Sequence, residues 1–294
     1  MVHINDVHLF SWENSMTSIF NSTLFNNKVV IVTGGATGIG AQIAHDFSML
    51  GAIVIIASRK EERCIKAAQG LSELTGNKVY AQSCNIREEE ACSSLVQSVC
   101  QEHNKLDILI NNGGGQFMSP AEHISKKGWN SVIDTNLTGT WNMTRAAADH
   151  WMLKNGGVVL NITMLTQRGW PGMAHSVSAR AGIEALTKTL AVEWAGKNIR
   201  INCIQPGIVA SSGVKNYPGG AAMFKQVQAE IPLKRLGTCE EIAQTACFLA
   251  SPAGSYVTGQ TWTVDGGRSL WGKTWPVPNP AELPSLHVRK WPWE

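Results

Sequence analysis

The sequence predicts an α/β fold of the doubly wound type, and two observations carry this prediction. A β-branched run over residues 28–32 leads directly into TGGATGIG, residues 33–40, and a second apolar run, GAIVIIA at residues 51–57, follows a helical pattern. This order of strand, glycine turn, helix and strand is a βαβ unit. With 294 residues, 44% of them hydrophobic, the chain can bury one substantial core, so a second domain is unnecessary.

The glycine turn is typical of a dinucleotide site. Gly34 permits a tight turn, while Gly38 and Gly40 let a pyrophosphate approach the free N–H groups at the start of the helix. Alone, the cluster would also fit an ordinary glycine-rich turn, but the βαβ context favours the nucleotide interpretation. The candidate phosphate-binding residues are Gly34, Thr37, Gly38, Ile39 and Gly40.

Basic residues follow the second strand. Ser58, Arg59 and Lys60 stand where a carboxylate would accept hydrogen bonds from both ribose hydroxyls of NAD, whereas a guanidinium pairs with a 2′-phosphate. The sequence therefore predicts NADP(H) as the cofactor. The alternative is that Arg59 and Lys60 are solvated charges that open the next helix.

Four further segments continue the pattern of strands. They are DILINN (residues 107–112) with three glycines behind it, GVVLNI (157–162), IRINCIQPGIV (199–209) and TGQTWTVDGG (258–267). In this order the segments resemble the short-chain dehydrogenase/reductase family over residues 28–268. The resemblance implies a Rossmann-type domain with a mostly parallel seven-stranded sheet, flanked by an N-terminal extension, residues 1–27, and a C-terminal tail, residues 269–294.

The resemblance also implies roles for individual residues. Asn136, in DTNLTGT, matches the catalytic asparagine, and Thr163 matches the catalytic hydroxyl residue. Asn85 stands where an aspartate commonly contacts adenine, and Ser211 matches the hydroxyl that meets the nicotinamide carboxamide. The positions that the family would bring to the cofactor here are Asn85, Asn112, Gly113, Arg180, Pro206, Gly207, Ile208 and Ser211.

One landmark of the family is absent, a Tyr followed four residues later by a Lys. The tyrosines Tyr80, Tyr217 and Tyr256 are followed at that distance by Cys, Ala and Gln. Ser176 and Arg180, within AHSVSARAG, take the two positions. Together with NNGGGQF, CNIREEE, LAVEWAGKNIRINCIQPG and VDGGRSLW, this run resembles the branch of peroxisomal trans-2-enoyl-CoA reductases and their bacterial relatives, which also lacks the tyrosine.

Chemistry favours the same branch. Ketone reduction needs a positioned proton donor, worth a factor of about 10²–10⁴, and Ser176 is a poor one. Reduction of a conjugated thioester makes an enolate instead, whose oxygen needs preorganised donors. Thr163, Ser176 and Arg180 are the candidates, with Arg180 also expected to hold the ribose hydroxyls. His175 is a rival proton donor, although a histidine at a helix start is more often exposed or a cap.

Composition limits the remaining classes. The net charge of +3 is mild and dispersed, so nucleic-acid binding has no support. Seven cysteines without CxxC spacing indicate buried free thiols in a reducing compartment, and no apolar run is long enough to span a membrane. The cytoplasm is therefore the expected location. Trp170 and Met173 are candidates for an apolar acyl pocket, and the Trp- and Pro-rich tail predicts an extended segment packed on a surface.

Three functions stay open at this point. The first is an oxidoreductase that transfers hydride from NADPH to the β-carbon of a trans-2-enoyl thioester, with an acyl-CoA as the expected small-molecule substrate. The second is a carbonyl or alcohol dehydrogenase of the same fold, including one for terpenoid alcohols, and the third is a catalytically silent NADP-binding scaffold. By resemblance, a homo-oligomer, commonly a tetramer in this family, is expected.

Overall fold

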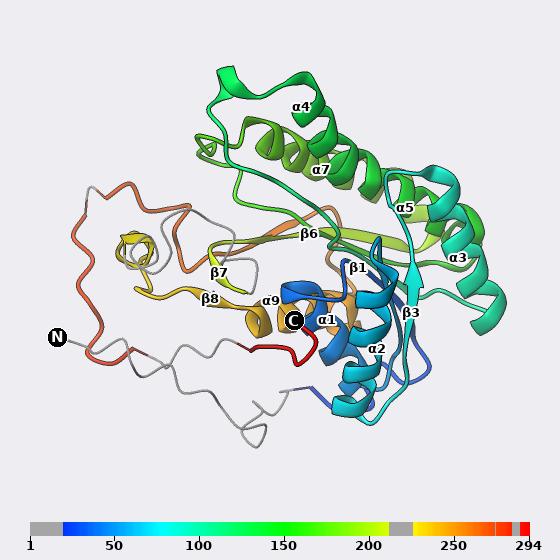
Figure 1. Ribbon diagram of the computed structural model, residues 1–294. Helices are drawn as coiled ribbons and strands as arrows, with labels where there is room; N and C mark the ends of the chain where they lie inside the picture. Colours follow the sequence, from blue (N-terminus) through cyan, green and yellow to red (C-terminus); the bar gives the residue numbers. More distant parts are fainter. Residues whose placement is uncertain (1–19, 212–225, 274, 284–288) are drawn as a thin grey trace.

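A parallel sheet of seven strands forms the centre of the computed structural model, which describes residues 20–211, 226–273, 275–283 and 289–294 (Figure 1). The strands are β1 (Val29–Thr33), β2 (Ile53–Ser58), β3 (Val79–Ser83), β4 (Ile108–Asn111), β5 (Gly157–Ile162), β6 (Ile199–Pro206) and β9 (Thr261–Val264). Their order is β3-β2-β1-β4-β5-β6-β9, and every neighbouring pair is parallel. The predicted doubly wound α/β fold is confirmed.

Helices cover both faces of the sheet. One face carries α1 (Gly38–Met49), α2 (Glu61–Thr75) and α9 (Cys239–Ala250), and the other carries α3 (Glu89–His103), α5 (Gly139–Ala147) and α7 (Ala174–Glu193) (Figure 1). Further helical segments are α4 (Lys126–Ile133), α6 (Leu153–Asn155), the π-helical turns η2 (Asp134–Thr138) and η3 (Ala148–Met152), and the 3-10 turns η1 (Ala121–His123), η4 (Ala195–Lys197) and η6 (Pro252–Gly254). A two-stranded parallel pair, β7 (Val209–Ala210) with β8 (Gly237–Thr238), lies beside the main sheet.

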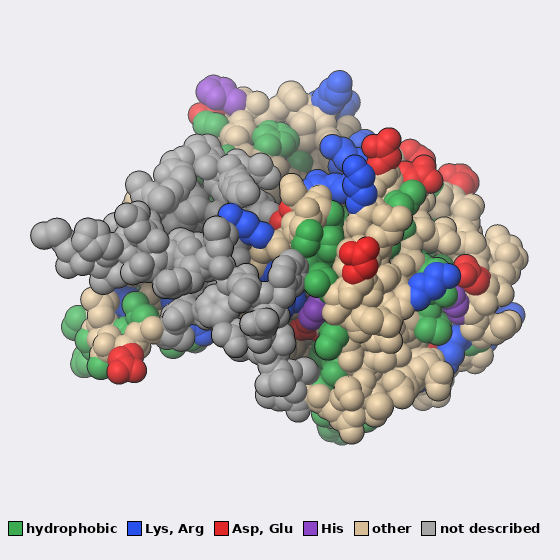
Figure 2. Space-filling model, turned by 60° about the horizontal axis from the view of Figure 1, so that its bottom comes forward, with side chains coloured by type: hydrophobic (Ala, Val, Ile, Leu, Met, Phe, Trp, Pro, Cys, Tyr) green, Lys and Arg blue, Asp and Glu red, His purple; other side chains and the backbone are tan. Residues whose placement is uncertain are grey.

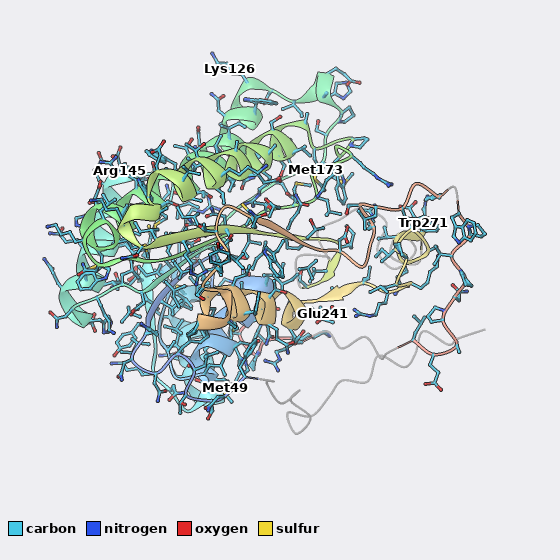
Figure 3. The ribbon with its side chains drawn as sticks, turned by 180° about the vertical axis from the view of Figure 1, so that it is seen from behind. Met49, Lys126, Arg145, Met173, Glu241 and Trp271 are labelled. Carbon is cyan, nitrogen blue, oxygen red and sulfur yellow. The ribbon has the colours of Figure 1, made fainter. Side chains whose placement is uncertain are left out.

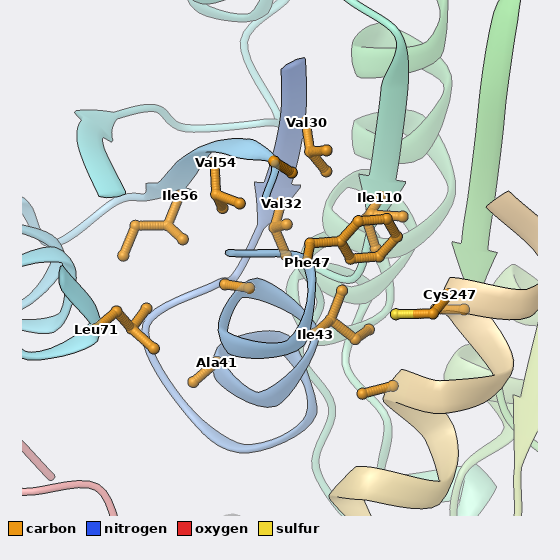
Figure 4. Close-up of a cluster of buried hydrophobic side chains, with 14 of the residues drawn as sticks. Val30, Val32, Ala41, Ile43, Phe47, Val54, Ile56, Leu71, Ile110 and Cys247 are labelled. Atoms are coloured by element: carbon orange, nitrogen blue, oxygen red, sulfur yellow. The ribbon is translucent and has the colours of Figure 1, made fainter. Parts of the chain in front are cut away.

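The core is divided by the sheet because successive side chains of a strand point to opposite faces. Val30 and Val32 of β1 pack against Ile43 and Phe47 of α1, with Cys247 of α9 beside them (Figure 4). The alternate residues of β1 belong to the second cluster, with α3, α5 and α7. Both faces of the central strands are therefore buried, which explains their continuous apolar runs.

The second strand begins two residues later than predicted, because of Gly51. The second strand was expected from Gly51, but Gly51 has φ +91° and forms the turn after α1, so β2 begins at Ile53. That backbone conformation is disfavoured for residues with a Cβ. The strand ends at Ser58, which places Arg59 immediately behind it.

The chain ends pack on the domain. Residues 1–19 of the expected N-terminal extension lie outside the described residues, but Phe25 is buried against Phe47 of α1 with ring centroids 4.6 Å apart. The described part of the tail contains no helix, as expected for its prolines. The tail was expected to pack on a surface, with its tryptophans against this subunit or a neighbour; Trp291, 4% exposed, packs on this subunit, whereas Trp275 is 74% exposed.

The dispersed charges and the buried free thiols that the composition predicts are both present. Lys and Arg side chains lie among Asp and Glu side chains on the face drawn in Figure 2. All seven cysteines are free, and six of them are buried. Among the described helices, none is long and apolar enough to cross a membrane.

Candidate active site

The glycine loop between β1 and α1 has the geometry of a phosphate cradle. Gly34 and Gly38 have φ values of +64° and +53°, which residues with a Cβ rarely adopt. A Cβ on Gly40 would lie 2.3 Å from the carbonyl oxygen of Gly34. Thr37 precedes α1 without a side-chain cap, and Ile39 and Gly40 complete the first turn, so the N-terminal N–H groups of the helix face an anion site.

Asn112 and Gly113 hold this loop in place. The Thr33 hydroxyl accepts hydrogen bonds from the amides of Asn112 (3.0 Å) and Gly113 (2.9 Å). The Asn112 side chain donates to the carbonyls of Thr33 (3.1 Å) and Gly34 (3.2 Å). The two residues therefore support the cradle from β4, and a dinucleotide fits the residues present.

Two cations, Arg59 and Lys60, follow the end of β2. Arg59 and Lys60 are exposed, and Arg59 makes no ion pair among the described residues. The Ser58 hydroxyl accepts from the amide of Lys60 at 3.3 Å. Asn85, after β3, is already engaged, since its amide donates to Glu88 at 2.6 Å. Arg59 thus remains available for a phosphate.

Asn136 forms two hydrogen bonds to the glycine run that follows β4, residues 113–115. Its Oδ1 accepts from the amide of Gly115 and its Nδ2 donates to the Gly115 carbonyl, both at 2.9 Å. The residue is fully buried in the π-helical turn η2, whose extra residue turns the side chain toward Gly115. Such π-helical turns are frequent at functional sites.

Arg180 is a buried cation at the centre of the site. It is 8% exposed, and its Nη1 donates to the carbonyl of Ile162 at 2.8 Å. The other terminal nitrogen lies 2.2 Å from where a Cβ on Gly114 would be, and Asn136 lies 2.8 Å from the same point. Burial lowers the pKa of Arg180 to about 10, so the guanidinium is still charged at neutral pH, yet no carboxylate pairs with it in the described part of the chain.

The two hydroxyl candidates point to different partners. The Thr163 hydroxyl donates to the Ile204 carbonyl at 3.2 Å, while the Ser176 hydroxyl donates to Gln116 Oε1 at 2.8 Å and lies 3.4 Å from the sulfur of Met164. Sequence reasoning missed Gln116 and Met164. Gln116 directly follows the glycine run in NNGGGQF, and that position was the signal that could have identified it.

His175 differs from its expected place. It was expected to be exposed or to act as a helix cap; the exposure was wrong, because His175 is fully buried, in a T-shaped contact with Phe117 whose ring centroids are 4.4 Å apart. Its Nδ1 accepts from the amide of Ser176 at 2.7 Å, and its Nε2 has no hydrogen-bond partner among the described residues. Burial lowers the pKa of His175, against a smaller opposing contribution from the backbone of Met173. The correction has a simple cause, because the loop that carries Phe117 folds over the start of α7.

Two cavities open near the carboxyl ends of β6 and β9. The larger, about 640 Å³, is lined by Gln167, Ile208, Thr263 and Leu270 among others. Pro206 ends β6, and a Cβ on Gly207 would lie 2.7 Å from Asp265, so this turn is closely packed. Ser211 is half-buried, and the residues that follow it, 212–225, lie outside the described residues.

The second cavity, about 230 Å³, carries aromatic and basic side chains. Trp170 and Trp271 line it with Arg168, Arg268 and Lys273. Met173, the other pocket candidate, is buried at the N-terminal end of α7, which points toward the same end of the molecule as Trp271 (Figure 3).

The fold is shared with known proteins. Residues 34–269 match the family described as Enoyl-(Acyl carrier protein) reductase. The chain belongs to this short-chain dehydrogenase/reductase family. Membership confirms the family predicted from the sequence and implies an oxidoreductase with a nicotinamide cofactor.

Relatives in this family carry several names. The chain is 38% identical to the peroxisomal 2,4-dienoyl-CoA reductase [(3E)-enoyl-CoA-producing] of Pongo abelii, over 86% of this chain and 87% of the relative. It is 39% identical to the 3-oxoacyl-[acyl-carrier-protein] reductase FabG of Chlamydia muridarum, over 84% of this chain and 100% of the relative. Among solved structures, the citronellol catabolism dehydrogenase AtuB of Pseudomonas aeruginosa PAO1 superposes with a TM-score of 0.77 at 39% identity, covering 86% of this chain and 99% of that one.

Proposed function

We propose that this family member is an NADPH-dependent reductase of conjugated enoyl thioesters, with trans-2-enoyl-CoA as its substrate class. The observation that carries the proposal is Arg180, a buried guanidinium without a carboxylate partner among the described residues. A buried unpaired charge costs several kcal/mol, on the order of 3–5 when one partner of a pair is missing. An anion formed during the reaction offsets that cost.

The main role that we propose for the protein's side chains is to stabilise the negative charge that develops on the substrate. When bound, the nicotinamide supplies the hydride that reduces the double bond. As the β-carbon is reduced, negative charge moves to the thioester oxygen, and Arg180 stabilises it in a site of low dielectric constant. Asn136 positions the glycine run beside the guanidinium, because its two hydrogen bonds hold Gly115, and the preceding Gly114 lies against Arg180. Stabilisation of the enolate by Arg180 requires no side chain that protonates the thioester oxygen.

The α-carbon must then take a proton. The Ser176 hydroxyl donates its hydrogen bond to Gln116 Oε1, so its lone pairs remain to accept a hydrogen bond from a water. Such a water is the proton source that we propose for the enolate. This arrangement is consistent with the loss of the tyrosine, whose proton a ketone reduction would require at the carbonyl oxygen.

The names of two relatives make a dienoyl thioester the second candidate substrate. In a 2,4-dienoyl thioester the double bonds are conjugated through to the same thioester oxygen, and reduction at the δ-carbon also places charge there. Arg180 would serve both reactions in the same way. The two reactions differ in which carbon of the acyl group, the β-carbon or the δ-carbon, lies next to the nicotinamide.

The charges around the smaller cavity support a phosphorylated carrier such as CoA. Arg168, Arg268 and Lys273 line it with one carboxylate, Glu230, which pairs with Arg268 at 3.5 Å and Lys273 at 3.0 Å. An excess of two positive charges attracts phosphate groups. A homotetramer in the cytoplasm is part of the same proposal, and light scattering of the purified protein tests the tetramer.

Arg180→Ala is the variant that tests the proposed function. We expect kcat/KM for enoyl-CoA to fall by about 100-fold or more, the loss typical of one oxyanion donor. Ser176→Ala should lower the rate moderately and His175→Ala little. Arg145→Ala is the matched control, because Arg145 is an exposed arginine paired with Asp149 far from the site, and it should leave turnover unchanged.

A panel of enoyl-CoA, dienoyl-CoA, ketone and alcohol substrates separates the alternatives. Turnover confined to ketones or alcohols would contradict the proposal and favour a carbonyl or alcohol dehydrogenase. NADPH binding with no turnover on any substrate would favour the catalytically silent scaffold.

A further inference from the structure

The end of the C-terminal tail packs beside the glycine loop. Trp291 is buried against His45 of α1, with ring centroids 5.7 Å apart, and stacks on Trp293 at 5.1 Å. Arg289 lies over the Trp291 ring and 3.7 Å from Glu240 at the start of α9. The chain therefore ends next to α1, α2 and α9 (Figure 1).

Trp293 is seated in a specific notch. Its indole N–H donates to the carbonyl of Ala36, inside the glycine loop, at 2.9 Å. Its ring occupies the space above Gly70 of α2, where a Cβ would lie only 2.2 Å from two ring atoms. The absence of a side chain at Gly70 is thus what makes room for the tail.

Glu294 then places a carboxylate at the N-terminus of α1. Its Oε1 accepts a hydrogen bond from the backbone amide of Gly38 at 3.1 Å. Thr37 provides no side-chain cap, and no acidic residue lies in the first turn of α1. The helix end that favours a cofactor phosphate is therefore satisfied by an anion from the far end of the chain.

We propose that the Trp291–Glu294 segment is a built-in competitor for the cofactor, with the Glu294 carboxylate occupying the anion site at Gly38 that a phosphate group of NADPH would use. The inference rests on the proposed cofactor but not on the substrate. One amide cannot serve two anions, and two negative groups at the same helix end repel each other. Cofactor binding therefore displaces the carboxylate, and the tail lowers the apparent affinity.

Two variants remove the competitor by different routes. Glu294→Gln keeps the size of the side chain and removes its charge, whereas Gly70→Ala fills the notch beneath Trp293 and leaves the tail sequence intact. Glu282→Gln is the matched control, since Glu282 is an exposed glutamate of the same tail. Calorimetric titrations of the full-length protein with NADPH and with 2′,5′-ADP measure the affinities.

Glu294→Gln and Gly70→Ala should each lower the Kd for both probes by about threefold or more, the size of one charge at a helix terminus, and Glu282→Gln should not. Unchanged Kd values in both variants would overturn the inference. Raised Kd values would overturn it as well, because Glu294 would then be a ligand of the cofactor. Since the readout is binding, a failure of enoyl-CoA turnover contradicts only the proposed function.

Discussion

Arg180 replaces a lysine's charge but not its proton chemistry. A guanidinium cannot be a base under working conditions, and even with its pKa lowered to about 10 by burial it remains a cation at neutral pH. The site is therefore suited to stabilising an anion and poorly suited to passing a proton to a ketone oxygen. This residue connects the missing Tyr–Lys pair with the reaction that we propose.

Under the proposed use of NADPH, the choice of cofactor depends on Arg59. We expect NADPH to bind at least about tenfold more tightly than NADH, a difference of about 1.4 kcal/mol, because an exposed guanidinium behind β2 can pair with the 2′-phosphate. Fluorescence titration of Arg59→Ala should show the preference lost. Arg63→Ala, an exposed arginine one turn along α2, serves as the control. Equal affinities for the two cofactors in the wild type would show that Arg59 is only a surface charge.

His175 predicts an acid sensitivity of the fold. Its pKa is lowered by burial, so the unfolded chain takes up a proton near pH 6.5 before the folded chain does. The stability that neutral His175 contributes is therefore present above about pH 6.5 and is lost as the pH falls toward the lowered pKa. Thermal melts from pH 7 to 5 should show a smaller loss of Tm in His175→Gln than in the wild type. An exposed-histidine control, His123→Gln, should behave as the wild type, and identical slopes in all three would refute the assignment.

At the scale of elements, the sequence predicted the strands that are buried on both faces. β1, β4 and β5 are nearly continuous apolar runs, and such runs are recognisable without structural information. β6, IRINCIQP, alternates apolar with polar residues and was recognised through its resemblance to the family segment. β3 was not predicted, because Val79–Ser83 is a half-buried edge strand with polar positions. The π-helical turn around Asn136 was also missed, since it depends on hydrogen bonds to Gly115, 21 residues away.

Site positions were easier to predict than site contacts. The order of motifs placed Gly34, Asn136 and Arg180 near the cofactor edge, because parallel strands end at one edge of the sheet. The partner of Ser176 is Gln116, 60 residues away, and no local pattern specifies such a pair. The same holds for the contact between Gly38 and Glu294 at opposite ends of the chain.

The strand-to-helix turn is the element most sensitive to a single methyl group. Gly40→Ala should destabilise the protein by about 1–3 kcal/mol and weaken NADPH binding, because its Cβ would meet the Gly34 carbonyl oxygen at 2.3 Å. Gly196→Ala, at a glycine with nothing within 4 Å of the added atom, should cost less than about 0.5 kcal/mol. Urea unfolding and calorimetric titration measure both effects. A Gly40→Ala protein with wild-type stability and affinity would disprove the tight-turn account.

In the whole molecule, the faces of the sheet carry the hydrophobic core, and the carboxyl ends of its strands carry the candidate site. The two hydrophobic clusters hold helices to its faces, while the glycine cradle, Arg180 and both cavities gather where the parallel strands end. Within the described part of the C-terminal tail, Trp271 lines the smaller cavity and Glu294 contacts the glycine cradle.

The fate of the transferred hydride tests the central claim most directly. With NADPH deuterated at the transferable position in ordinary water, the reduced enoyl-CoA should carry deuterium at the β-carbon. With unlabelled NADPH in heavy water, the label should appear at the α-carbon, since the enolate takes its proton from solvent. Mass spectrometry and NMR of the product locate the label. Deuterium on a carbonyl carbon, as in an alcohol product, would contradict the account.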